Sequence, residues 1–203
     1  ADGAAVEVDA CVITPAGRPL ARIIRGLDPA LADTLEGQEY ASLGVVHLAV
    51  PRSEQLIKDA FGVLFQAGMP DDLLGLMFNS QLFPHLAPPD KHILTAMVGR
   101  AHLRSKEFDE EGLQARLPQQ VSKLLGISSV EWLRFTKWIE AIPQLKVGHH
   151  KVVASLDAFE RAQPGLAIAG VDRGGVGVTE RVRLAQEAVK RVHYRVGEYR
   201  SVA

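Results

Sequence analysis

The stretch of this chain best suited to chemistry is a glycine-rich loop near its C-terminus. A short apolar run, LAIA at residues 166–169, follows a Pro-Gly turn and ends at Gly170. A run this short, bounded by glycine on both sides, is typical of a buried strand. Gly174, Gly175 and Gly177 follow within four residues, so no side chains cover the backbone amides there.

A helix is predicted after this loop. Thr179 is suited to the N-cap position, and Glu180 would lie in the first turn. The predicted apolar face consists of Val182, Ala185, Val189 and Val192. A strand, a glycine loop and a helix N-terminus can receive a phosphate or pyrophosphate, because free amides and the helix dipole point the same way. A tight glycine connection without any ligand explains the spacing equally well.

Metal or cysteine chemistry is not expected. The seven histidines show no HExxH motif, no cysteine partner and no pair four residues apart, so no metal site is predicted. Cys11 stands between apolar residues of a predicted strand and is expected to be a buried, inert thiol. A single cysteine excludes an internal disulfide and fits a reducing compartment.

Composition narrows the classes of function. The chain has 203 residues, of which 47% are hydrophobic and 23% charged, enough for one packed domain or one and a half. A formal net charge of −1 provides no basic field, so nucleic acid is not an expected partner. No apolar stretch reaches the roughly 18 residues of a membrane span. No signal peptide is visible, so a cytoplasmic location is the default expectation.

The hydrophobic pattern predicts an α+β fold. Strands are expected at residues 5–13, 40–50, 61–67, 73–80, 92–99, 130–138 and 165–170, with turns at 70–72 and 88–90. Helices are expected after Asp28, between Asp109 and Gly126, and over residues 148–161. The stripe of the middle helix is Leu113, Leu117, Val121 and Leu124. Pro118 within that helix predicts a kink or two shorter pieces.

The end of the chain also resembles a known family. Trp138, the Ile-Pro-Gln of residues 142–144, Gly148-His149, the Pro-Gly-Leu of residues 164–166 and the glycine loop follow one another in a characteristic order. In order and spacing they closely resemble the C-terminus of protoporphyrinogen-oxidase-like flavoproteins, which belong to the FAD-dependent amine oxidase superfamily. The resemblance implies that His149 forms a structural hydrogen bond near the start of a helix.

The resemblance implies a domain organisation. A largely antiparallel substrate-domain sheet with helices would be inserted into a partial FAD/NAD(P)-binding, Rossmann-like domain. Residues 1–16 and 148–203 would belong to the FAD domain, and residues 17–147 would bind substrate. The strands at 5–13 and 165–170 should then approach each other. The part of the family's chain that precedes residues 1–16 would be missing.

The resemblance also implies a cofactor, FAD, in the intact protein. The residues expected to contact it are Trp138, Gly170, Gly174, Gly175, Val176, Gly177, Val178 and Thr179. No catalytic side chain is named, since the flavin performs the electron chemistry. The chain has no GxGxxG motif after a strand, so by itself it is expected to hold FAD poorly and to be inactive.

The leading functional hypothesis is an FAD-dependent oxidoreductase that dehydrogenates a large apolar or tetrapyrrole-like small molecule. The family often has Asn or Ser where this chain has Val171. An amine or an isoprenoid polyene is therefore the alternative substrate. A non-catalytic binding domain is a third alternative. The apolar stretch 61–86 is expected to form the substrate-domain core more than to line a pocket. Contact with a membrane surface and homo-oligomerisation also stay open.

Overall fold

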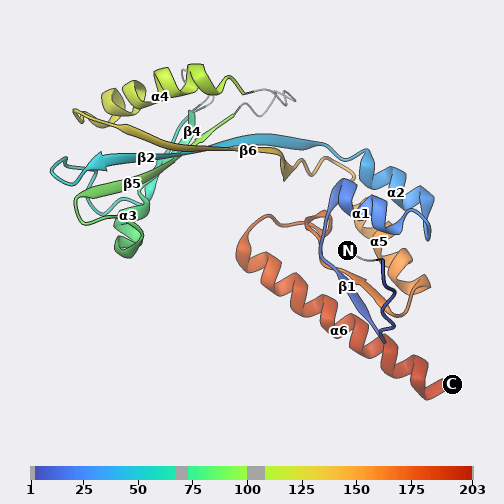
Figure 1. Ribbon diagram of the computed structural model, residues 1–203. Helices are drawn as coiled ribbons and strands as arrows, with labels where there is room; N and C mark the ends of the chain where they lie inside the picture. The colour runs from blue at the N-terminus through green and yellow to red at the C-terminus, as the bar shows by residue number, and fades with distance from the viewer. Residues whose placement is uncertain (1–2, 67–72, 100–107, 203) are drawn as a thin grey trace. The chain divides into compact units, whose positions relative to one another are not determined.

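The chain folds into two compact units. The computed structural model describes residues 3–66, 73–99 and 108–202. Unit 1 comprises Ala1–Glu39 and Pro143–Ala203, and unit 2 comprises Tyr40–Ile142 (Figure 1). These bounds differ from the expected ones because helices α1 (Gly17–Ile24) and α2 (Pro29–Glu36) each bury one apolar face in the core of unit 1. The assignment of one unit to FAD and the other to substrate stays a prediction.

A parallel pair of short strands forms the centre of unit 1. Strands β1 (Cys11–Ile13) and β7 (Leu166–Ile168) pair in parallel, with Cys11 opposite Leu166 and Ile13 opposite Ile168. The expected approach of these two segments is confirmed. The strand predicted over residues 5–13 is too long, because β7 offers only three residues for pairing.

Helices cover both faces of this strand pair. Side chains alternate between the faces of a strand. Ile13 and Ile168 therefore pack toward α1, α2 and α5 (His150–Ala162), while Val12 and Ala167 pack toward α6 (Val178–Val202). Figure 1 shows α6 on one side of β1, and α1 and α5 on the other. Cys11 is exposed and not buried as expected, because it stands at the end of β1 where the chain leaves the packed pair.

The last helix packs through a face that shares only Val192 with the expected one. Its buried residues are Leu184, Ala188 and Val192, whereas Val182, Ala185 and Val189 are exposed. Two apolar stripes fit the same helical period, and tertiary contacts select one of them. The helix also begins at Val178, so Thr179 lies in its first turn and the expected N-cap is wrong.

Unit 2 is built on a five-stranded sheet with strand order β3-β4-β5-β2-β6. The strands are β2 (Tyr40–Pro51), β3 (Gly62–Leu64), β4 (Leu73–Met77), β5 (Lys91–Val98) and β6 (Glu131–Pro143). The pairs β2–β5, β3–β4 and β4–β5 are antiparallel, and Leu48 lies opposite Leu94 in the first of them. The predicted antiparallel sheet and α+β class are confirmed. The turn expected at residues 70–72 lies outside the described residues.

The predicted strand 73–80 ends early. Asn79 and Ser80 begin a short helix, α3 (Asn79–Leu82), which is followed by the 3-10 turn η2 (Pro84–Leu86). The Ser80 hydroxyl oxygen accepts the N–H of Ile93 at 3.1 Å, so its side chain replaces a strand partner for that amide. Side chains of this kind compete with sheet hydrogen bonds and favour a break in the strand.

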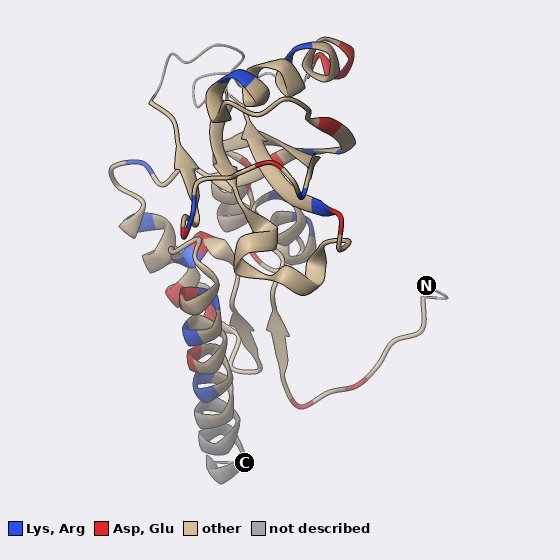
Figure 2. Ribbon diagram, turned by 90° about the vertical axis from the view of Figure 1, so that its left-hand side faces the viewer, with Lys and Arg blue, Asp and Glu red and all other residues tan. Residues whose placement is uncertain are grey.

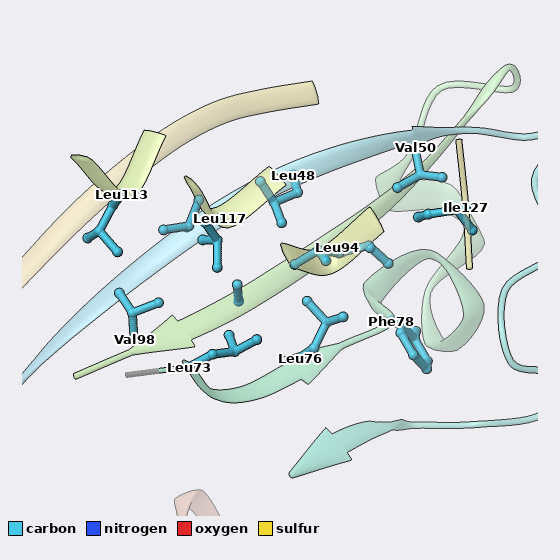
Figure 3. Packing of buried hydrophobic residues seen from close by; sticks show 13 residues of the cluster. Leu48, Val50, Leu73, Leu76, Phe78, Leu94, Val98, Leu113, Leu117 and Ile127 are labelled. Atoms are coloured by element: carbon cyan, nitrogen blue, oxygen red, sulfur yellow. The ribbon is translucent and has the colours of Figure 1, made fainter. Parts of the chain in front are cut away.

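Helix α4 (Glu110–Leu125) covers one face of the sheet. Asp109 is its N-cap, accepting the Gly112 N–H at 2.9 Å, and Gly126 ends it with a φ of 67°. Leu113, Leu117 and Val121 are buried in the cluster that Figure 3 shows around Leu48 and Leu94. The helix continues through Pro118, so the expected two-piece alternative is wrong, because buried side chains on either side of the proline anchor both halves. Leu124 is exposed and does not extend the stripe.

Helix α6 has a charged outer surface. Figure 2 shows acidic and basic residues side by side along it. Arg183 forms ion pairs with Glu180 and Glu187. Among the described helices none is both long and apolar enough to span a membrane.

Candidate functional site

The glycine loop joins β7 to α6 within unit 1. After Gly170 the chain makes the 3-10 turn η3 (Val171–Arg173) and reaches Gly174 and Gly175. These two glycines have φ angles of 106° and 66°, in the region that strains residues with a β-carbon. The path of the loop therefore depends on glycine at both positions.

Gly170 has a packing role. A β-carbon added there would lie 2.7 Å from the carbonyl oxygen of Pro15 and 3.3 Å from the β-carbon of Ala16. Glycine thus allows the end of β7 to approach the segment that follows β1. Contact of Gly170 with a cofactor stays a prediction.

Gly170→Ala is expected to lower the free energy of unfolding by about 1–3 kcal/mol, because the new methyl group would press on backbone atoms. Gly177→Ala is the matched control, since a β-carbon there meets nothing within 4 Å. That control is expected to change stability by less than about 1 kcal/mol. Urea unfolding followed by far-UV circular dichroism compares the two variants. Equal midpoints would contradict the close approach at Gly170.

Arg173 anchors the loop from its buried side. Its Nε donates to the carbonyl oxygen of Ile168 at 2.7 Å, its Nη1 to Asp157 at 2.7 Å and its Nη2 to Glu160 at 2.5 Å. The Arg173 side chain is only 6% exposed. These contacts tie the turn η3 to β7 and α5.

Glu160 is a fully buried carboxylate at the centre of this ion cluster. It accepts the Ile168 N–H at 2.7 Å and the Nε of Arg191 on α6 at 3.0 Å. Burial alone would raise the pKa of Glu160. The Ile168 amide and the charges of Arg173 and Arg191 outweigh burial, so the pKa lies below its ordinary value. An ionised Glu160 therefore links α5, β7, η3 and α6.

Asp172 and His149 fix the other side of the turn. The buried Oδ2 of Asp172 accepts the N–H of Gly17 at 2.8 Å. The carbonyl oxygen of Asp172 accepts a hydrogen bond from Nε2 of His149 at 2.7 Å. The expected structural role of His149, at the start of α5, is confirmed.

This anchoring leaves the outer side of the loop open. The N–H groups of Arg173 and Gly174 donate within the turn itself. In the described part of the chain, no hydrogen bond uses the N–H of Gly175, Val176 or Gly177. Consecutive free amides in front of a helix N-terminus form a site suited to an anion.

Arg181 adds a cation that sequence reasoning missed. Its Nη2 donates to the carbonyl oxygen of Gly174, while its Nε and Nη1 are buried without a hydrogen-bond partner among the described residues. Buried guanidinium donors without partners are costly, and an anionic oxygen at the loop would satisfy them. The sequence shows an arginine in the first turns of the helix, but not that it turns back toward the loop. These residues fit the pyrophosphate part of a dinucleotide such as FAD.

The structure gathers most of the predicted cofactor residues. Seven of them lie in or directly beside the loop: Gly170, Gly174, Gly175, Val176, Gly177, Val178 and Thr179. Trp138 lies on β6 in unit 2 and is 55% exposed, and its role toward a flavin stays a prediction. Within the described ranges no group of three His, Cys, Asp or Glu residues is placed to hold a metal ion.

Solved structures share this fold. Reduced UDP-galactopyranose mutase matches with a TM-score of 0.71 at 16% identity, over 95% of this chain and 42% of that chain. A protein from Exiguobacterium sp. 255-15 matches with a TM-score of 0.68 at 22% identity, over 94% of this chain and 42% of that one. At these identities the matches establish the fold alone.

A family profile, together with more distant sequence relatives, identifies the family. Coproporphyrinogen III oxidase of Bacillus subtilis (strain 168) is 25% identical over 192 residues, covering 93% of this chain and 40% of the relative. Chloroplastic protoporphyrinogen oxidase of Nicotiana tabacum is 28% identical over 196 residues, covering 89% of this chain and 35% of the relative. The chain thus spans about two fifths of the length of these relatives. The family profile described as flavin containing amine oxidoreductase matches residues 1–192, and the chain belongs to this family.

Proposed function

We propose that this chain is the part of an FAD-dependent oxidoreductase that holds the anionic portion of the cofactor and contributes the site for a large apolar or tetrapyrrole-like substrate. The observation that carries the proposal is the run of free amides at residues 175–177 beside the unpartnered guanidinium nitrogens of Arg181. Membership of a flavin family supports FAD as the ligand. The names of the relatives, coproporphyrinogen III oxidase and protoporphyrinogen oxidase, support a tetrapyrrole-like substrate.

Each group has a defined task in this proposal. When bound, FAD supplies the electron chemistry by accepting a hydride from the substrate. The amides of Gly175, Val176 and Gly177 would hold the phosphate oxygens, and Arg181 would balance their charge. Arg173 and Glu160 keep the loop in its binding conformation. Trp138 is proposed to exclude water from the flavin.

A second candidate substrate is an amine or an isoprenoid polyene. It is favoured by the residues that follow Gly170, where the family often has Asn or Ser. Here Val171 stands at that position, and the two residues after it serve the fold, because Asp172 binds the Gly17 amide and Arg173 binds Glu160. A loop rebuilt in this way is compatible with a change of substrate.

Titration of the chain with FAD, followed by amide NMR, tests the cofactor site. The signals of Gly175, Val176 and Gly177 are expected to shift. Binding is expected to be weak, because each hydrogen bond contributes about 0.5–1.5 kcal/mol net, whereas nanomolar affinity requires about 12 kcal/mol. Arg181→Gln is expected to raise the Kd about tenfold, through loss of a charge-assisted hydrogen bond.

Arg183→Gln is the control for this titration, since Arg183 lies on the same helix with its side chain 52% exposed. It is expected to change the Kd by less than about twofold. Shifts that avoid residues 175–177, or equal effects of the two substitutions, would contradict the proposal. Absence of any FAD-dependent shift would favour a binding domain without a flavin.

A further inference from the structure

A second concave site lies entirely within unit 2. It is a cavity of about 670 Å³ at the end of β2, between the loop after β2, helix α3 and the start of β5. Cavities of roughly 300–1,000 Å³ are typical of small-molecule sites. The residues that define its chemistry are Arg52, Lys58, Phe61, Ser80, Leu82 and His92.

The cavity carries two cations without acidic partners. Neither the Arg52 nor the Lys58 side chain forms an ion pair or hydrogen bond within the described part of unit 2. The main chain of Arg52 is fixed, because its N–H donates to the carbonyl oxygen of Asp90 at 2.8 Å. Asp59 is the one acidic residue of the lining, so cations outnumber anions there.

His92 supplies a third donor. The Ser80 hydroxyl oxygen accepts the Ile93 N–H at 3.1 Å and lies 3.4 Å from Nδ1 of His92, so the hydroxyl can donate its proton to that nitrogen. Burial and the positive charge of Arg52 lower the pKa of His92, which favours the neutral ring. A neutral ring that accepts at Nδ1 carries its proton on Nε2, where it can donate to a ligand.

Apolar side chains form the remaining wall. Phe61 and Leu82 line the cavity and are 63% and 38% exposed, although both are large hydrophobic residues. Leu56 and Pro84 extend this wall. Residues 61–86 were expected to form a core more than to line a pocket, and the structure shows both roles: Leu76 and Phe78 are buried, whereas Phe61 and Leu82 line the cavity.

We propose that this cavity binds a small organic carboxylate with an aromatic or aliphatic body. The carboxylate lies toward Arg52, Lys58 and Nε2 of His92, and the body packs on Phe61 and Leu82. Guanidinium and carboxylate groups are matched in geometry as well as charge, and small-molecule sites combine an apolar wall with a few polar groups. The lining residues of the cavity all belong to unit 2, whereas the glycine loop belongs to unit 1, so the proposal goes beyond the proposed cofactor function.

Amide NMR titration of the whole chain with 2-naphthoate tests the site. Saturable shifts are expected at residues 56–61, 80–82 and 92, with a Kd on the order of 1 mM or below. The uncharged amide, 2-naphthamide, is expected to bind at least about fivefold more weakly, since it lacks the charge that Arg52 and Lys58 recognise.

Arg52→Gln is expected to raise the Kd for 2-naphthoate at least about fivefold. Arg134→Gln removes the same charge from an exposed position on β6 and is expected to leave the Kd unchanged. Equal affinity for acid and amide, equal effects of the two substitutions, or shifts without saturation would overturn the proposal. FAD binding is measured from the amide signals of residues 175–177, and 2-naphthoate binding is measured from amide signals of unit 2. Failure of one proposal is therefore distinguishable from failure of the other.

Discussion

Glu160→Ala is expected to lower the free energy of unfolding of unit 1 by about 3–5 kcal/mol. The substitution removes the carboxylate that Arg173, Arg191 and the Ile168 amide share. Arg173 is 6% exposed, so its guanidinium cannot recover full hydration in place of this partner. Removing one member of a buried charge cluster is costly because the remaining charges stay desolvated.

Native-state hydrogen exchange of the amides in α5 and β7 measures this loss directly. Tryptophan fluorescence follows the unfolding of unit 2, because both tryptophans, Trp132 and Trp138, lie there. The stability of unit 2 is therefore an internal reference for that of unit 1. Glu187→Ala is the matched control, since it removes an exposed glutamate that pairs with Arg183. The control is expected to cost less than about 0.5 kcal/mol. Equal losses in the two variants would contradict a structural role for the buried cluster.

The pH dependence separates charge from packing at the same position. The pKa of Glu160 is lower in the folded chain than its ordinary value of 4.5. Its stabilising contribution is therefore fully present above about pH 4.5 and is lost as the pH falls through the folded-state pKa. The stability difference between the wild type and Glu160→Gln is expected to shrink over that acidic range. A difference that stays constant there would show that packing and not charge carries the effect.

Features with local causes were predictable from the sequence. The N-caps Asp28 and Asp109 and the αL residue Gly126 stand where helix ends were expected, because capping depends on neighbours in the chain. Strands β2 and β5 are rich in β-forming residues and agree with their predicted bounds within one or two residues. The glycine loop was visible for the same reason, since its conformation depends on its own glycines.

Features with tertiary causes were not predictable. Residues 5–10 have the pattern of a strand, but β7 is too short to pair with them. The face of α6 that packs contains Arg191, whose partner Glu160 lies 31 positions earlier in the chain. Glu160 itself is a charged residue on the buried side of α5, where sequence patterns predict apolar side chains. Only the folded arrangement brings the cluster behind the loop together.

Phe78→Ala is expected to lower the free energy of unfolding of unit 2 by about 3–5 kcal/mol. Phe78 is fully buried in the cluster under α4, and the deleted ring would leave a cavity that movement of α3 fills only in part. Its backbone is also fixed, because its N–H donates to the Phe61 carbonyl at 3.0 Å and its carbonyl accepts the Gln81 N–H at 3.0 Å. Urea unfolding, followed by the fluorescence of Trp132 and Trp138, measures this decrease in the free energy of unfolding of unit 2.

Phe83→Ala provides the control for this experiment, because the Phe83 side chain is 50% exposed only five residues away. It is expected to cost less than about 1 kcal/mol, as surface substitutions usually do. Similar midpoints for the two variants would show that Phe78 is not a central part of the core. The carboxylate site adds a second readout, since Phe78 and Phe61 share a backbone hydrogen bond at the entrance to α3. Because collapse around the missing ring would displace Ser80 and Leu82, Phe78→Ala is expected to weaken 2-naphthoate binding even where unit 2 remains folded.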